Sequence, residues 1–122
     1  MKPVLYLYRS CTSCRNAVAV LEEHGVDYEP REFFKDPITS EELASLLDRA
    51  GLKPSELVST RSSVWRNEKL GEQNLAEEEL FERMLREPRL LRRPILVTED
   101  GVEIGFNRSR YEQIATSLAS RD

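Results

Sequence analysis

Two cysteines stand three positions apart near the start of the chain, Cys11 and Cys14. A Cys-x-x-Cys pair that follows a buried strand and begins a helix is typical of a thiol redox motif. The first sulfur then lies at a helix N-terminus, where free N–H groups and the helix dipole favour an anion. Such surroundings can lower a thiol pKa from ~8.5 to between about 3.5 and 7.5. We therefore predict that Cys11 is a nucleophilic thiolate and that Cys14 resolves an oxidised Cys11 as a disulfide.

Positive charge beside the motif supports this prediction. Arg9 and Arg15 lie close to Cys11 in the sequence. A nearby cation favours the charged form of a thiol and so lowers its pKa. We assign this role to Arg15.

Other roles for the two cysteines have to be weighed. A zinc site needs about four ligands, and two cysteines with the single histidine, His24, do not supply them within one chain. Zinc would therefore require an intermolecular site, and we predict no metal. Buried, inert cysteines are common, but a strand–Cys-x-x-Cys–helix context is unusual for them. We expect His24 to lie at the C-terminal end of the helix, where it favours the dipole, and not to act as a base.

The composition limits the class of protein. The chain has 122 residues, with 18 Lys+Arg against 22 Asp+Glu and 39% hydrophobic residues. This length and composition predict one globular domain over residues 1–122, and the acidic balance argues against broad nucleic-acid binding. Two cysteines are too few for a disulfide scaffold. The sequence shows no signal peptide and no apolar stretch of membrane-spanning length, so we expect a cytoplasmic protein with no membrane contact.

The elements that must position the cysteines begin with a short apolar run at 3–8, which predicts a central strand buried on both faces. An amphipathic helix follows the cysteines and is expected to end at Gly25. Val26 and Tyr28 alternate with polar residues and predict a second strand. Pro30 in that run places the strand at a sheet edge, where a missing N–H does little harm.

The middle of the chain predicts helices only. Residues 39–42 (TSEE) form a capping-box pattern that begins a helix, and Gly51 ends it. One further helical turn is expected at 54–58. An amphipathic helix is expected around 80–85, interrupted before Pro88.

The C-terminal part predicts a hairpin and a closing helix. Strands at 95–98 and 102–106 flank an Asp-Gly turn, and apolar residues at helical spacing follow over 111–118. The element order is β-α-β, a helical insertion at about 39–91, and then β-β-α. With the first two strands parallel and the last two in a hairpin, this order predicts an α/β fold with a thioredoxin/glutaredoxin-like core.

Four separated motifs carry a family resemblance. They are CTSCRNA at 11–17, STRSSVW at 59–65, LLRRPI at 90–95 and IGFN at 104–107. In this order they resemble the arsenate reductase (ArsC) family, and their spacing is similar to that of its Spx-like branch. The resemblance covers nearly the whole chain. It implies a thioredoxin fold with a helical insertion, the architecture that the element order predicts.

The resemblance also implies roles for single residues. Cys11 matches the cysteine that attacks arsenate in the reductases. Arg61 and Arg93 match arginines that bind the oxyanion, and guanidinium groups suit such anions because they donate bidentate hydrogen bonds. Pro94 matches a proline that faces the active site, and the resemblance implies a cis bond there. We expect Arg92 on the surface.

The chain departs from the reductase pattern at two places. Phe106 stands where these reductases have a third arginine, and Arg108 comes two residues later. Cys14 stands near a position where they usually have serine, so an internal disulfide can form here. The Spx-like branch contacts RNA polymerase through a glycine whose position falls on Lys53, whereas Gly51 is two residues out of register.

Two main functions follow as hypotheses. The first is a cytoplasmic thiol oxidoreductase that acts on a small oxyanion or a thiol/disulfide substrate. It has no bound cofactor, and glutathione/glutaredoxin or thioredoxin is the external reductant. The alternative is an Spx-like redox-sensing transcriptional regulator that binds the RNA polymerase α subunit through a Cys11–Cys14 disulfide switch, without contacting nucleic acid directly. A family member with a different substrate is the third.

Overall fold

The computed structural model describes residues 2–120 of the chain. The chain divides into two compact units. The first, the core unit, consists of Met1–Phe33 and Arg93–Asp122, and the second, the inserted unit, consists of Phe34–Arg92. The inserted unit contains the whole 39–91 range in which the sequence predicts a helical insertion.

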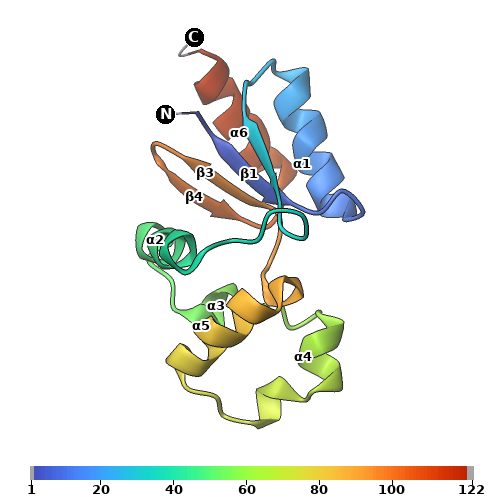
Figure 1. Cartoon of the computed structure of the whole chain (residues 1–122). Helices are drawn as coiled ribbons and strands as arrows, with labels where there is room; N and C mark the ends of the chain where they lie inside the picture. Colours follow the sequence, from blue (N-terminus) through green and yellow to red (C-terminus); the bar gives the residue numbers. More distant parts are fainter. Residues whose placement is uncertain (1, 121–122) are drawn as a thin grey trace. The chain divides into compact units, whose positions relative to one another are not determined.

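Within residues 2–120, the core unit contains a four-stranded sheet and two helices (Figure 1). In chain order its elements are β1 (Val4–Leu7), α1 (Thr12–Glu23), β2 (Glu29–Glu32), β3 (Ile95–Thr98), β4 (Gly101–Ile104) and α6 (Arg108–Ala119). The sheet order is β2-β1-β3-β4, with β1 parallel to β2 and antiparallel to β3, and with β3 and β4 forming a hairpin. This is the β-α-β … β-β-α arrangement of a thioredoxin-type core, and it confirms the predicted fold class.

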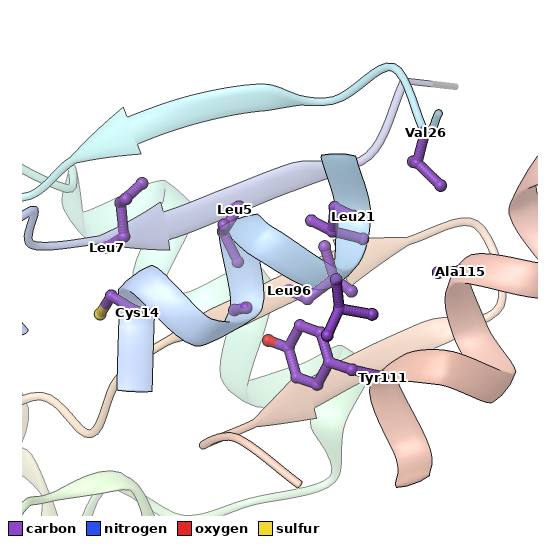
Figure 2. Packing of buried hydrophobic residues seen from close by; sticks show 10 residues of the cluster. Leu5, Leu7, Cys14, Leu21, Val26, Leu96, Tyr111 and Ala115 are labelled. Carbon is purple, nitrogen blue, oxygen red and sulfur yellow. The ribbon is translucent and has the colours of Figure 1, made fainter. Parts of the chain in front are cut away.

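The main hydrophobic cluster packs α1 and α6 against one face of this sheet (Figure 2). Its buried members are Leu5, Leu7, Cys14, Ala17, Val20, Leu21, Val26, Leu96, Tyr111 and Ala115. Successive strand residues point to opposite faces, so the β1 residue Tyr6 lies on the other face, where its ring stacks on Phe33. Because Leu5, Tyr6 and Leu7 are all buried, the prediction of a central strand covered on both faces is confirmed.

The second strand lies at the sheet edge, as Pro30 predicts, and Pro30 pairs in register with Leu5. The strand begins later than the sequence pattern suggests, because Val26 follows the C-cap of α1 and turns back onto the last turn of that helix. Its N–H donates to the Leu21 carbonyl at 3.0 Å and its side chain joins the hydrophobic cluster. The prediction that Val26 and Tyr28 lie in the strand was therefore wrong.

The inserted unit is helical over its described residues. In chain order its elements are α2 (Ser40–Ala50), α3 (Pro54–Leu57), α4 (Ser63–Asn67), the 3-10 turn η1 (Leu70–Glu72), α5 (Glu77–Arg86) and the 3-10 turn η2 (Pro88–Leu90). The predicted capping box is present, since Glu42 N–H donates to the Thr39 hydroxyl at 3.1 Å and Thr39 N–H donates to the Glu42 carboxylate at 3.0 Å. Gly51 ends α2 with a left-handed φ of 67°. None of the helices within residues 2–120 is long and apolar enough to cross a membrane.

Two distant segments of the inserted unit are joined by backbone pairing. Val58 and Leu91 form an antiparallel bridge. The Ser59 N–H donates to the Leu90 carbonyl at 2.6 Å, and the Arg92 N–H donates to the Leu57 carbonyl at 3.0 Å. This pairing fixes the chain that carries the STRS segment and the chain that leads into Arg93.

Candidate redox site

Cys11 is the N-cap residue of α1, with extended backbone angles of φ −83° and ψ 123°. Its sulfur accepts a hydrogen bond from the Cys14 N–H at 3.4 Å. Its own N–H donates to the Tyr8 carbonyl at 3.2 Å, which fixes the short loop between β1 and α1. The sulfur therefore lies at the helix N-terminus, as the sequence predicts.

Cys14 lies one turn further along α1 and is fully buried (Figure 2). Its sulfur accepts a hydrogen bond from the Tyr8 N–H at 3.5 Å. Both cysteines are free thiols. One sulfur is thus partly exposed and the other is covered, with one backbone donor directed at each.

The two thiols have opposite pKa shifts. Burial by itself raises the pKa of Cys11, but hydrogen bonds from Cys14 and the charge and hydrogen bond of Arg93 outweigh it, so the pKa lies below its ordinary value. Burial, followed by the neighbouring Cys11, raises the pKa of Cys14 to about 12. The outer thiol is therefore the more acidic of the two, and the inner one holds its proton at neutral pH.

Arg93 is the cation that acts on Cys11. Its guanidinium carbon lies 4.3 Å from the centroid of the Tyr8 ring, in a cation–π contact. The Arg93–Pro94 peptide bond is cis, as the resemblance implies. Pro94 is buried, and its carbonyl accepts a hydrogen bond from the Gly105 N–H at 2.8 Å. This hydrogen bond holds the residue after β4 against the cis-proline that follows Arg93.

Arg15 makes local contacts at the start of α1. Its guanidinium donates to the Arg9 carbonyl at 3.2 Å and to the Thr12 hydroxyl at 3.3 Å. These bonds brace the loop that carries Cys11. The role assigned to Arg15 in lowering the Cys11 pKa stays a prediction.

Arg61 is exposed and belongs to the inserted unit. The loop that carries it is well fixed, because Ser59 is paired to Leu90 and the Ser62 hydroxyl accepts a hydrogen bond from the Val64 N–H at 3.2 Å at the start of α4. A contact between Arg61 and an oxyanion bound at Cys11 stays a prediction. Arg92 is exposed as expected.

An aromatic ring fills the position where the reductases have a third arginine. Phe106 is partly buried against the hydrophobic cluster, and its ring centroid lies 5.0 Å from that of Tyr111. Arg108 lies over the outer side of the Phe106 ring at 5.7 Å and forms an ion pair with Glu112 at 3.9 Å. This part of the core unit therefore contributes packing, and Arg108 is engaged on the surface of α6.

The part of the chain that the structure describes contains no group of three or more His, Cys, Asp or Glu residues that could hold a metal ion. His24 is the C-cap residue of α1, and its Nδ1 contacts the Val20 carbonyl at 2.9 Å. This is the place that the sequence predicts for it.

Tyr8 is the residue of the site that the sequence analysis did not identify. Its N–H contacts Cys14, its carbonyl contacts Cys11, and its ring contacts Arg93. The available signal was an aromatic residue directly after a buried strand and three positions before the first cysteine. That signal does not distinguish a site residue from an ordinary core residue.

Comparison with known proteins gives consistent matches. The model of the ArsC family matches residues 6–114. A global transcriptional regulator Spx from Listeria innocua is 38% identical over 109 residues, covering 89% of this chain and 83% of its own length. A solved structure from Bacteroides fragilis, described as related to the ArsC family, has a TM-score of 0.83 at 29% identity and covers 93% of this chain and 99% of its own. A structure described as a possible arsenate reductase from Streptococcus mutans has a TM-score of 0.78 at 27% identity, covering 92% and 96%.

Proposed function

The chain belongs to the ArsC family, and we propose that it is a thiol-dependent oxidoreductase in which Cys11 is the nucleophile and Cys14 is the resolving thiol. One observation carries the proposal. The partly exposed Cys11 sulfur caps α1 and has a lowered pKa, while the buried Cys14 sulfur lies one turn behind it with a raised pKa. Such a pair separates the attacking thiol from the thiol that completes the reaction.

With arsenate as substrate, the proposed reaction proceeds in two steps. The Cys11 thiolate forms a bond to arsenic, and an arsenate hydroxyl group takes a proton from solvent and leaves as water. Cys14 then gives its proton to solvent and attacks the Cys11 sulfur, the S–As bond breaks, and its electron pair leaves with arsenic as arsenite, which takes up a proton from solvent. Arsenic gains two electrons, and two thiols become one disulfide. An external thiol can replace Cys14 in the second step and gives a mixed disulfide instead.

The first step prepares Cys14 for the second. Burial first, and then the hydrogen bond and charge of the Cys11 sulfur, raise the pKa of Cys14 to about 12. When Cys11 is bonded to substrate, its negative charge is gone and that contribution ends. The resolving thiol therefore becomes easier to ionise only after the attack.

Arg61 and Arg93 are proposed to bind the oxyanion, and Arg15 to assist Cys11. Arg93 also stabilises the Cys11 thiolate, because its positive charge lowers the pKa that burial of Cys11 raises. A cytoplasmic reductant, glutathione with glutaredoxin or thioredoxin, is proposed to reduce the Cys11–Cys14 disulfide after each cycle.

The test is turnover of arsenate by the purified full chain with each of these reductant systems, measured as NADPH consumption. We expect turnover that Cys11→Ser abolishes and Cys14→Ser reduces or makes dependent on glutathione. A rate equal to that of Cys11→Ser with every reductant would remove arsenate as the substrate. Rapid thiol–disulfide exchange with small disulfides would then retain the oxidoreductase class.

A second candidate function is favoured by the relatives. The Listeria innocua relative, at 38% identity, is named a global transcriptional regulator. The corresponding proposal is a redox-sensing regulator in which the Cys11–Cys14 disulfide changes binding to the RNA polymerase α subunit. A pull-down with the C-terminal domain of that subunit separates the two functions. Binding that differs between oxidised and reduced protein supports regulation, and no binding in either state removes it.

A further inference from the structure

We propose that Tyr8 is a positioning residue that holds the Arg93 guanidinium beside Cys11 and so keeps the Cys11 sulfur reactive. The inference rests on the proposed thiol chemistry and extends it to a residue outside the Cys-x-x-Cys, STRS and Arg-Pro motifs. Three separate contacts of Tyr8 converge on the site.

The backbone of Tyr8 connects the two cysteines. Its carbonyl accepts a hydrogen bond from the Cys11 N–H at 3.2 Å, and its N–H donates to the Cys14 sulfur at 3.5 Å. Tyr8 comes directly after the last residue of β1, so its backbone position follows from the central strand of the sheet. Any residue other than proline at position 8 could make these two backbone contacts.

The ring of Tyr8 makes the third contact, which is specific to an aromatic side chain. The Arg93 guanidinium carbon lies 4.3 Å from the ring centroid, within the range of a cation–π interaction. The ring is held in turn by Phe33, which meets it edge-on at 5.6 Å and 81°. Tyr8 is only 6% exposed, so its ring is a fixed support for a long, flexible arginine side chain.

The position of Arg93 matters because its charge and hydrogen bond act on Cys11 against the effect of burial. An arginine side chain that packs against nothing samples many rotamers, and its guanidinium is hydrated by solvent. Loss of the aromatic ring should therefore let the guanidinium move away from Cys11. The effect of burial would then raise the pKa of Cys11. The role assigned to the ring is to act on Cys11 through Arg93 alone.

The experiment measures the rate of Cys11 alkylation by iodoacetamide as a function of pH, with the modified residue identified by mass spectrometry. Tyr8→Leu is expected to slow alkylation at pH 7 by about threefold to tenfold and to raise the pKa of Cys11. Tyr8→Phe, which keeps the ring, is expected to stay within about twofold of the wild type. Tyr8→Met, whose unbranched and flexible side chain adapts to the space that the ring leaves, repeats the test if the leucine variant does not fold.

Tyr6 supplies a matched control. It is 7% exposed, stacks on the same Phe33 ring at 5.7 Å, and has a different arginine, Arg31, 5.8 Å from its ring centroid. Tyr6→Leu removes an equivalent ring from the same face of the sheet without touching Arg93. We expect its alkylation rate to match the wild type, which separates loss of positioning from general loosening of the fold.

A double-mutant cycle decides whether Tyr8 acts through Arg93. In an Arg93→Met background, Tyr8→Leu should produce no further slowing. An equal slowing in both backgrounds, an unchanged rate in Tyr8→Leu, or a lowered pKa of Cys11 would each overturn the proposal. Alkylation needs no substrate, so the role of Tyr8 is decided even if arsenate turnover fails and the proposed function falls.

Discussion

The sulfur of Cys11 takes the place that a serine, threonine or aspartate oxygen usually occupies at a helix N-terminus, since it accepts the Cys14 N–H at 3.4 Å. The reactive atom of the site is therefore also the cap of α1. A bond to substrate or to Cys14 changes the group that caps the helix. Chemistry and local stability are coupled at this one atom.

The first prediction concerns that cap. Cys11→Ala removes the only side-chain acceptor at this position and should lower the free energy of unfolding by about 1 kcal/mol. Cys11→Ser keeps an acceptor and should be at least as stable as the wild type in its reduced form. Denaturant unfolding under reducing conditions compares the three proteins. Equal stability of the alanine and serine variants would show that the cap contributes nothing.

The second prediction concerns pH. Since the pKa of Cys11 lies below the ordinary thiol value of 9.0, the alkylation rate should have its inflection below pH 9.0 and fall as the pH drops through the folded pKa. Between the folded pKa of Cys11 and its ordinary value, the unfolded chain binds more protons than the folded one, so the free energy of unfolding should rise with pH. Arg93→Met should move the inflection upward. An inflection at or above 9.0 in the wild type, the ordinary value, would contradict the assignment.

The third prediction concerns Cys14 at high pH. Burial raises its pKa to about 12, so between pH 9 and 12 the unfolded chain releases a proton that the folded protein keeps. The folded state then binds more protons, and stability falls as the pH rises. Cys14→Ala should show a shallower decline than the wild type, whatever its absolute stability. Parallel declines by denaturant unfolding in reducing buffer would exclude a buried, protonated Cys14.

The fourth prediction concerns the oxyanion. Arg61→Ala should weaken arsenate binding about tenfold or more, because a charge-assisted hydrogen bond contributes roughly 1.5–3 kcal/mol. Arg66→Ala is the matched control, since Arg66 is also an exposed arginine of the inserted unit. It should bind arsenate within about twofold of the wild type. Titration calorimetry with Cys11→Ser protein measures binding without turnover, and equal loss in both variants would argue against a specific role for Arg61.

The fifth prediction concerns Tyr111, which is fully buried and whose hydroxyl has no hydrogen-bond partner within residues 2–120. Burial of an unpaired hydroxyl is unfavourable, so Tyr111→Phe should leave stability unchanged or raise it by about 1 kcal/mol. Tyr111→Ala, which removes the ring, should lower it by roughly 3–5 kcal/mol. Thermal and denaturant unfolding measure both. A destabilised phenylalanine variant would reveal a partner for the hydroxyl.

Local patterns in the sequence were sufficient for the elements that depend on neighbours along the chain. The Thr39–Glu42 capping box, the left-handed Gly51 and the sulfur cap at Cys11 each follow from residues within one helical turn. The edge position of β2 follows from Pro30, because proline lacks the N–H that a central strand needs.

Contacts between distant residues could not be predicted in this way. The contact of Arg93 with Tyr8 joins the end of the first strand to a loop far along the chain, and no periodicity encodes it. The short helix α4 was missed because its five residues carry no amphipathic repeat. Val26 was placed in a strand because its alternation with Asp27 does not reveal the hydrogen bond from its N–H back to Leu21 in α1.

The full burial of Cys14 has a consequence for damage. A thiol that meets an oxidant first becomes a sulfenic acid, and a further oxidant molecule converts it irreversibly to sulfinic acid. Cys14 is shielded from both events, and its sulfur sits one helical turn from that of Cys11. Disulfide closure inside the fold needs no collision with another molecule, whereas overoxidation does. We therefore expect a sulfenic acid at Cys11 to condense with the Cys14 thiol, with loss of water, to a disulfide that thiols can reduce.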